Sequence, residues 1–297
     1  MKPHHVAATA VLLTLLAAPV AHATPVSTSV ATGKAGPATT SDACGPQPVK
    51  PDGSRWHCTF VDDFAARSLD RTKWVPQTAF ASGTTAAFAC YRDDPSVVSV
   101  SGGSLNLTVR RVDTPVTCPV GDTVSSTRYL AGMVSTYHLF SQQYGRFEAR
   151  TRTTAASYPG LQEAFWLWPD DRVTSAFTWP DAGEIDVSET YSVHPDLSIP
   201  FLHYSADAGG SQPGVNTAWD CTALRGQWNT YAVEWSPTRV EIFVNGRSCL
   251  VNTSGDQAFQ KPYIVALTEG LGGVGNDYDG RAPLPATMNV DYVRVWK

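Results

Sequence analysis

The sequence has few charged residues and no surplus of positive ones. Asp, Glu, Lys and Arg together make up 16% of the 297 residues, and the formal net charge is -5. A protein that binds nucleic acid uses clustered Lys and Arg to neutralise phosphates. We therefore expect no nucleic-acid partner. With 42% hydrophobic residues, the composition is that of an ordinary globular domain.

Several common catalytic and metal-binding motifs are also missing. The sequence has no Gly-x-Ser-x-Gly, no His-Glu-x-x-His, no phosphate-binding glycine loop and no Cys-x-x-Cys. These absences argue against the enzyme and zinc-site classes that such motifs define. No stretch shows an amphipathic helix longer than a turn or two, and no segment repeats at a fixed period. The second absence argues against solenoids and propellers.

One long hydrophobic run is present, from Val6 to Ala18 near the N-terminus. Lys2 precedes it and Ala21-His22-Ala23 follows it, a combination typical of a secretory signal peptide. We expect residues 1–23 to be that signal and the protein to be secreted. Because the run is shorter than a membrane-spanning helix, we expect no membrane partner.

The stretch that follows the predicted signal is almost entirely Thr, Ser, Ala, Gly, Pro and Val. Such a composition buries too little hydrophobic surface to offset the entropy of ordering the chain. We therefore predict a disordered linker over residues 24–43. Residues 44–297 remain as a single folded domain, for which we expect a monomer.

The six cysteines predict three disulfides, because an exported protein meets an oxidising environment. The sequence alone does not choose among the possible pairings. Sequential pairing gives the shortest loops and is our expectation: Cys44 with Cys58, Cys90 with Cys118, and Cys221 with Cys249.

Most of the domain follows the two-residue alternation of β-strands. Tyr231, Val233 and Trp235 share one face of a run, and the next run ends at Asn245-Gly246, a hairpin-turn signal. Similar runs cover Ser104–Arg110, Gly145–Arg152, Glu163–Trp168, Tyr263–Leu267 and Met288–Trp296. Many short strands separated by turns predict an all-β fold, an antiparallel sandwich or barrel.

Three acidic residues lie within the six positions from Glu184 to Glu189, although the chain has only seven Glu in all. In an extended strand Ile185 and Val187 would face the core, while Glu184 and Asp186 would face the opposite side. Strict alternation would turn Glu189 toward the core. We therefore predict a β-bulge near Val187-Ser188, which would bring Glu189 to the face of the other two acids.

This acidic window suits the hydrolysis of glycosides, which uses one ionised and one protonated carboxyl. A solvated acidic strand is the alternative interpretation. Aromatic residues in the same region favour a sugar ligand, because sugar rings stack on indole rings. Trp166, Trp168, Trp179 and Trp219 are the candidates for substrate binding, and a purely structural role is the alternative for each.

The window and the residues before it, Trp179-Pro-Asp-Ala-Gly, resemble the signature of glycoside hydrolase family 16 in its bulged, laminarinase-like form. Other segments resemble family blocks in the family's order: Phe60-Val-Asp-Asp-Phe64, Ser68–Trp74, Tyr144–Arg150, Ala164–Pro169, Trp228–Trp235 and Asp291–Trp296. The resemblance implies a β-sandwich jelly roll of two curved antiparallel sheets, whose concave face forms an open cleft. It also implies a retaining endo-β-glycosidase whose partner is a polysaccharide.

The resemblance also implies roles for single residues. Glu184 matches the nucleophile, Asp186 the assisting acid beside it, and Glu189 the general acid/base. His203 matches a histidine on the following strand that contacts the acid/base or the substrate, with a structural role as the alternative. No cofactor is required, but some family members hold a structural calcium ion, which would involve Asp291 and the neighbourhood of Asp63.

The substrate expected from the resemblance is β-1,3-glucan. Two departures bear on it: Ser188 stands where laminarinases commonly have Met, and residues 264–270 differ from their usual block beside the cleft. A β-galactan or another β-linked polysaccharide is the alternative substrate. Transglycosylation and non-catalytic glycan binding are the alternative activities.

Overall fold

Alternating hydrophobic residues build two packed β-sheets in the computed structural model, which describes residues 41–84, 87–120, 123–173, 178–205, 210–273 and 275–297. The predicted signal peptide and most of the predicted linker lie outside these residues. The end of the linker differs from the prediction, because Ser41–Asp42 forms strand β1 and pairs with β2 (Gly45–Pro46). A carboxylate oxygen of Asp42 also accepts a hydrogen bond from the Cys58 backbone N–H, so ordered structure begins before residue 44.

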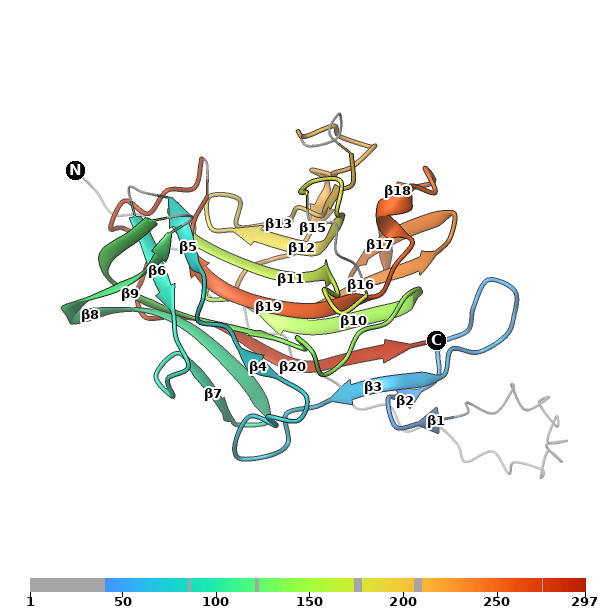
Figure 1. Cartoon of the computed structure of the whole chain (residues 1–297), viewed down its shortest axis with the longest axis horizontal. Helices are drawn as coiled ribbons and strands as arrows, with labels where there is room; N and C mark the ends of the chain where they lie inside the picture. Colours follow the sequence, from blue (N-terminus) through green and yellow to red (C-terminus); the bar gives the residue numbers. More distant parts are fainter. Residues whose placement is uncertain (1–40, 85–86, 121–122, 174–177, 206–209, 274) are drawn as a thin grey trace, which may run out of the picture. The chain divides into compact units, whose positions relative to one another are not determined.

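The first sheet carries the acidic window, and three of its strands lie side by side in Figure 1: β12, β11 and β19. Its order is β14 (Phe201–His203), β12 (Glu184–Tyr191), β11 (Leu161–Pro169), β19 (Tyr263–Leu271) and β9 (Thr123–Ser135). The short strand β4 (Val75–Pro76) also pairs with β9. All of these pairs are antiparallel.

The second sheet packs against the first through a shared buried cluster and is also antiparallel. Its order is β7 (Val98–Ser101), β8 (Ser104–Val120), β20 (Ala286–Trp296), β10 (Gly145–Arg152), β16 (Asn229–Ser236), β17 (Arg239–Val244) and β18 (Arg247–Asn252), with β3 (Cys58–Asp62) also paired to β20. The strands predicted from sequence alternation are all present, and β10 has the predicted bounds.

Strands β8 and β9 pair with each other and join the two sheets. Beside them lies a hairpin of β5 (Ala81–Thr84) and β6 (Ala87–Tyr91), and β6 pairs with β9 in parallel. The remaining elements are a small sheet of β13 (Leu197–Ser198) with β15 (Cys221–Thr222), and a short 3-10 helix, η2 (Gln257–Phe259). The predicted antiparallel sandwich is therefore confirmed, with one parallel pair.

The core lies between the inward faces of the two sheets. Phe165 and Ile185 of the first sheet belong to the same buried cluster as Tyr231, Val233 and Trp235 of the second. The sequence predicted that these last three share a face, and all three are buried. Full burial of one such side chain contributes about 1.5–3 kcal/mol. The burial of this layer therefore largely determines which face of each strand points toward the core.

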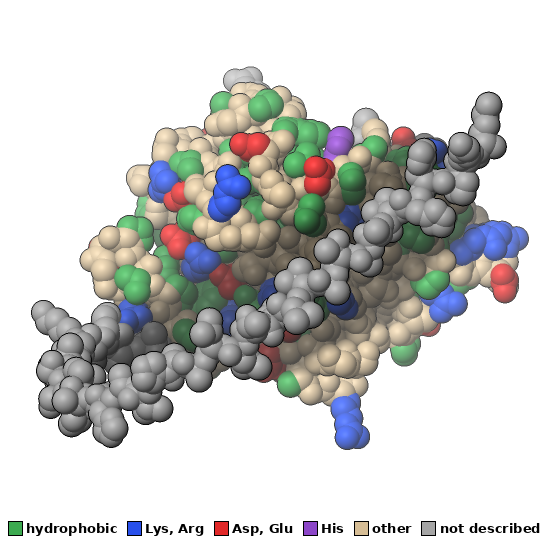
Figure 2. Space-filling view, turned by 180° about the vertical axis from the view of Figure 1, so that it is seen from behind, with side chains coloured by type: hydrophobic (Ala, Val, Ile, Leu, Met, Phe, Trp, Pro, Cys, Tyr) green, Lys and Arg blue, Asp and Glu red, His purple; other side chains and the backbone are tan. Residues whose placement is uncertain are grey.

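The predicted hairpin turn also forms, between β17 and β18. Asn245 and Gly246 have φ angles of 51° and 76°, the left-handed region that both central residues of a type I′ turn occupy. Among the described residues no helix is long and apolar enough to span a lipid bilayer. On the face shown in Figure 2, Lys and Arg side chains are spread out and many stand beside Asp or Glu.

The three predicted disulfides are confirmed: Cys44–Cys58, Cys90–Cys118 and Cys221–Cys249. The second joins β6 to β8, so it fastens the β5–β6 hairpin to the long strands that connect the sheets. Cys90 and Cys118 are both buried.

Replacing Cys90 and Cys118 together by Ser should lower the free energy of unfolding by about 3–4 kcal/mol, because the unfolded chain regains the entropy of an open loop. Urea denaturation of both proteins measures the loss. The matched control is the double replacement of Cys44 and Cys58, whose separation of 14 residues is half that of the 28-residue pair. The control should lose about 0.6 kcal/mol less. A Cys90/Cys118 variant as stable as the wild type would contradict this account.

Candidate active site

Strand β12 contains the predicted bulge. In its pairing with β11, Asp186 lies opposite Trp166 and Ser188 lies opposite Phe165, so Val187 is the extra residue. Val187 packs in the core cluster, and the Ser188 hydroxyl bonds to Ser198 beneath the sheet. Two consecutive side chains thus face inward, and the alternation after them is reversed. Glu189 consequently faces the same side as Glu184 and Asp186.

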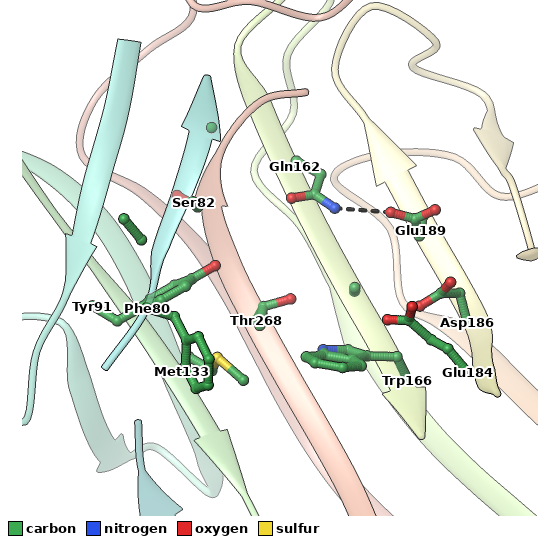
Figure 3. Close-up of a pocket in the computed structure, with 13 residues that line it drawn as sticks. Phe80, Ser82, Tyr91, Met133, Gln162, Trp166, Glu184, Asp186, Glu189 and Thr268 are labelled. Carbon is green, nitrogen blue, oxygen red and sulfur yellow. Dashed lines mark hydrogen bonds between the residues drawn. The ribbon is translucent and has the colours of Figure 1, made fainter. Parts of the chain in front are cut away.

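The three acids line one pocket on the outer face of the first sheet. Figure 3 shows them on β12, with Phe80, Tyr91 and Met133 on the opposite side. Gln162, Trp166 and Thr268 form the floor between the two sides. The pocket is therefore a groove that crosses β11 and β19, with carboxyl groups along one wall.

The Glu184 and Asp186 carboxyls lie beside a histidine and a tryptophan. The Trp179 indole Nε1–H donates to Glu184 Oε2 at 2.8 Å, and His203 Nε2 lies 3.3 Å from Asp186 Oδ2. One ligand atom from each of Glu184, Asp186 and His203 lies within 4.8 Å of the others. The His203 ring stacks on Phe201 with centroids 4.2 Å apart, which fixes its orientation.

The Glu189 carboxyl is held by two donors on the groove face. Gln162 Nε2 donates to Glu189 Oε1 at 2.9 Å, and the Tyr191 hydroxyl donates to the same oxygen at 2.7 Å. Gln162 lies on β11 opposite Tyr191 of β12. The two donors therefore come from the two strands whose pairing contains the bulge. Both of these donors bond to Oε1 and neither bonds to Oε2.

Burial shifts the pKa of every ionisable group in this cluster. It raises the pKa of Glu184 to about 8, with a further increase from the charge of Asp186. Burial also raises the pKa of Asp186 well above its usual range and raises that of Glu189, although the bonds from Tyr191 and Gln162 oppose the second shift. Burial lowers the pKa of His203. Because the three carboxyls share one buried site, they titrate as a set that retains a proton at neutral pH.

The predicted substrate-binding residues take different places. Trp166 lies between the acid-lined pocket and a second pocket, and Trp168 lines only the second. Trp179 and Trp219 are 49% and 48% exposed. Trp179 contacts Glu184 and His203, whereas Trp219 packs on the ring of His194 and lines neither pocket. The structure thus brings Trp166, Trp179 and His203 to the acids and leaves Trp219 apart from them.

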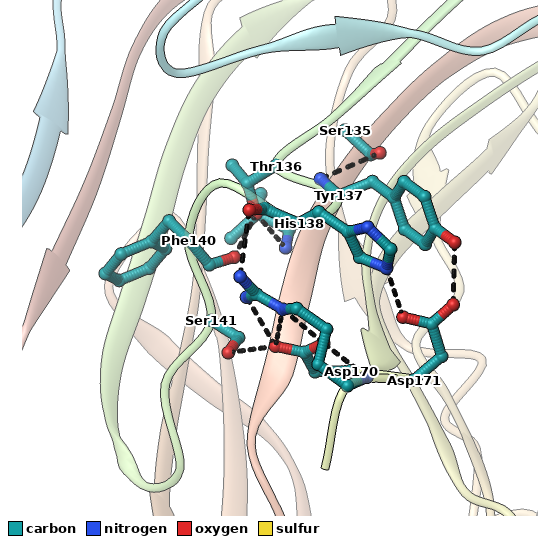
Figure 4. Close-up of polar contacts among 10 residues, drawn as sticks. Ser135, Thr136, Tyr137, His138, Phe140, Ser141, Asp170 and Asp171 are labelled. Carbon is teal, nitrogen blue, oxygen red and sulfur yellow. Dashed lines mark hydrogen bonds and ion pairs between the residues drawn. The ribbon is translucent and has the colours of Figure 1, made fainter. Parts of the chain in front are cut away.

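The second pocket continues the groove away from the acids and ends at the contacts in Figure 4. The Tyr137 hydroxyl donates to Asp171 Oδ2 and His138 Nε2 lies beside Asp171 Oδ1, both at 2.6 Å. Behind them, hydrogen bonds from Arg172 and Ser141 lower the pKa of Asp170 to about 2. These contacts tie the turn after β9 to the turn after β11.

Some residues of the groove were not expected from the sequence. Gln162 and Tyr191 contact Glu189, while Tyr137 and Asp171 line the far end. Trp166 and Trp168 follow Gln162 by four and six residues along β11, so strand alternation could have predicted that Gln162 shares their face. No comparable signal marks Tyr137 and Asp171, because they lie in turns.

Asp291 is the residue predicted to bind calcium. Its Oδ2 lies 2.7 Å from Arg150 Nη1 in an ion pair, and calcium needs six to eight oxygen ligands. Asp63 uses one carboxylate oxygen to accept the Ala65 backbone N–H. No group of potential metal ligands among the described residues includes Asp291. The metal role of Asp291 stays a prediction, and in this structure its carboxylate is paired with a guanidinium.

Replacing Trp179 by Phe should make Glu184 an about tenfold weaker acid, because the ionised carboxylate loses a hydrogen-bond donor. Carbon-13 NMR of the Glu side-chain carboxyls measures the titration, and the chain has only seven Glu. Trp219→Phe is the matched control, since Trp219 is equally exposed but touches none of the acids. An unchanged Glu184 titration in Trp179→Phe would contradict the assigned role of the indole.

Comparison with known proteins agrees with this geometry. Residues 84–270 match the family described as Glycosyl hydrolases family 16. The chain is 26% identical over 279 residues to glucan endo-1,3-beta-glucosidase A1 of Niallia circulans, an alignment that covers 84% of this chain and 39% of that protein. It is 30% identical over 244 residues to keratan-sulfate endo-1,4-beta-galactosidase of Sphingobacterium multivorum, covering 80% of this chain and 54% of that protein.

Solved structures show the same fold. The laminarinase from Rhodothermus marinus superposes with a TM-score of 0.66 at 25% identity and covers 82% of this chain and 97% of that one. The chain thus spans between about two fifths and just over half of the two curated relatives, but nearly all of the solved laminarinase. On the family match and the jelly-roll architecture together, the chain belongs to glycoside hydrolase family 16.

Proposed function

We propose that this protein is a secreted, retaining endo-β-glycosidase that hydrolyses a neutral polysaccharide, with β-1,3-glucan as the first candidate. The observation that carries the proposal is the bulge at Val187, which turns Glu184, Asp186 and Glu189 into one groove. The groove continues past the acids into the second pocket. A site open along its length suits cleavage within a chain rather than at its end.

In the proposed reaction the Glu184 carboxylate attacks the anomeric carbon while Glu189 gives its proton to the departing glycosidic oxygen. The bond between the sugar and that oxygen breaks as the bond to Glu184 forms. Water then attacks the same carbon, Glu189 takes its proton, and Glu184 is released.

Surrounding groups support these roles. The Trp179 N–H stabilises the ionised form of Glu184. The two donors to Glu189 Oε1 orient that carboxyl and leave Oε2 to carry the transferred proton. Asp186 lies between the other two in sequence, with a pKa raised by burial and by the charge of Glu189, so it can hold a proton while Glu184 is ionised.

The charge of the groove favours a neutral substrate. Of the described residues that line the two pockets, none is Lys or Arg, and four are acidic: Asp171, Glu184, Asp186 and Glu189. A sulfated glycan would meet these acids without a cationic partner. The similarity to a glucan endo-1,3-beta-glucosidase and to a laminarinase supports β-1,3-glucan.

A β-galactan is the second candidate, because the keratan-sulfate endo-1,4-beta-galactosidase of Sphingobacterium multivorum has the higher sequence identity of the two curated relatives compared above. Ile264, Ala266 and Thr268, which belong to the segment that departs from the laminarinase block, line the groove. They could therefore change the sugar that is accepted.

The remaining parts of the proposal concern the protein's location and state. We infer that residues 1–23 are removed on export and that the enzyme acts as a secreted monomer. The three disulfides support an oxidising compartment.

The test is a panel of laminarin, mixed-linkage β-glucan, an unsulfated β-galactan and keratan sulfate, scored for new reducing ends. We expect release from a neutral β-glucan and little or none from the sulfated glycan. Glu184→Gln should reduce the rate on the preferred substrate at least about a thousandfold, because it removes the nucleophile. Glu241→Gln is the control, since Glu241 lies on β17 and pairs with Arg239 outside the groove.

Other outcomes point to the alternative functions. Equal background hydrolysis by the wild type and Glu184→Gln, with both still binding glycan, would show a non-catalytic binding protein. Products longer than the substrate at high oligosaccharide concentration would show a transglycosylase. Release from the galactan but from no β-glucan would replace the first candidate by the second.

A further inference from the structure

Three ionisable side chains lie buried directly beneath the acid-lined groove and take no part in the proposed reaction. Glu163 on β11 and Glu269 on β19 are direct partners across the two strands. They point inward, opposite to the groove, and are 1% and 0% exposed. Arg225, in the loop after β15, has a side chain that is 2% exposed and forms an ion pair with Glu163. Two acids thus share one base in the interior.

The hydrogen bonds in this cluster are unevenly distributed between the two acids. Glu163 receives Arg225 Nη1 at 2.7 Å, Arg225 Nη2 at 2.6 Å and the Thr190 hydroxyl at 2.6 Å. No described donor forms a well-aligned bond to either carboxyl oxygen of Glu269. Its carboxyl does face that of Glu163. Two carboxyl groups can hydrogen-bond only if one holds a proton, and the donor count assigns the charge to Glu163 and the proton to Glu269.

The charge balance agrees with this assignment. With both acids ionised, the buried cluster would carry a net charge of minus one, and like charges on directly opposite residues are destabilising. With Glu269 protonated the cluster is neutral. Burial and the charge of Glu163 raise the pKa of Glu269 well above its usual range. Among the described residues the cluster is also faced by the Tyr91 and Tyr231 side chains, the Met288 backbone N–H and the Thr154 carbonyl, and none of them adds a cation.

The cluster touches the segment of β12 that carries Glu189. Thr190 lies opposite Glu163, and its neighbour Glu189 lies opposite Ala164. Gln162 and Tyr191 hold Glu189 from the groove face. The bond between Thr190 and Glu163 therefore holds the same short segment from the core face. If the pairing of β12 with β11 slipped by one residue after the bulge, Glu189 would turn toward the core. The buried bond between Thr190 and Glu163 opposes that slip.

We propose that Glu163, Arg225 and Glu269 form a buried, proton-sharing cluster that positions Glu189, through Thr190, for proton transfer. The inference deepens the proposed function and rests on it for the role of Glu189. The cluster's residues do not contact substrate. They act as positioning residues, since the Glu163 carboxylate accepts the Thr190 hydroxyl and Thr190 is bonded directly to Glu189.

Thr190→Val tests the positioning role, because it removes the hydroxyl and keeps the shape of the side chain. We expect kcat to fall about tenfold or more, since small misplacements of a catalytic group are costly, while KM changes less than about twofold. The limb of the pH–rate profile that reports Glu189 should shift, and Thr190→Ser should restore both. An unchanged kcat and pH profile in Thr190→Val would overturn the proposal.

Thr127→Val is the matched control for lost stability. Thr127 is also buried and donates its hydroxyl to a backbone carbonyl, that of Phe88, at 2.7 Å, but it lies on β9 away from Glu189. It should leave kcat unchanged when both variants are assayed well below their melting temperatures. An equal loss of kcat in the two variants would also overturn the proposal.

Glu269→Gln tests the shared proton without any substrate. In the wild type the unfolded chain loses the Glu269 proton near its usual pKa of about 4.3, whereas the folded protein retains it. The contribution of Glu269 to the stability of the wild type is therefore lost as pH rises above about 5, and the variant has no such pH-dependent contribution. The melting temperature of Glu269→Gln relative to the wild type should therefore rise as the pH increases above about 5.

A difference in melting temperature that does not change with pH would contradict the shared proton. A Glu269→Gln variant that fails to fold at every pH would also contradict it, because the amide matches a protonated carboxyl in size. The melting experiment also separates the two proposals. A wild type that cleaves no polysaccharide would refute the proposed function, while the melting curves would still decide whether the buried cluster holds its proton.

Discussion

The site depends on one departure from the two-residue alternation of a β-strand. Side chains on a strand face opposite sides in turn, and the packing of Ile185 and Val187 against the second sheet fixes which side is the core. Five positions separate Glu184 from Glu189, an odd number that would place them on opposite faces. The extra residue at Val187 restores them to one face. The core therefore determines the orientation of all three acids without touching them.

Burial raises the pKa of carboxyl groups on both faces of this sheet, but the two sets differ in how their charge is compensated. In the groove it raises the pKa of several carboxyls at once, so that protons are kept where a general acid needs one. Beneath the sheet burial likewise raises the pKa of Glu269, but there the Arg225 guanidinium and a retained proton cancel the charge. In the proposed reaction the first set exchanges protons with the substrate, whereas the second set is buried.

Much of this could be predicted from the sequence, because alternation and the bulge are local properties. The face shared by Tyr231, Val233 and Trp235 follows directly from spacing, and so does the need for an irregularity before Glu189. The bonds to Glu189 could not be predicted in the same way, because they depend on the register that places Gln162 opposite Tyr191. Trp219 shows the opposite limit: its residue type suits a sugar, but its loop places it against His194.

Asp291 and Glu163 show why charge patterns are the hardest to interpret before the fold is known. Asp291 sits at a position for which the family resemblance suggested calcium, and its partner here is Arg150, 141 residues earlier in the chain. Glu163 alternates with Phe165 and Leu167, so its inward direction was available from the sequence, but its cation comes from a loop 62 residues later. A carboxylate's neighbours determine whether it binds an ion, forms a salt bridge or holds a proton. Those neighbours are set by topology, and local spacing therefore predicts the direction of an acidic side chain more reliably than its chemistry.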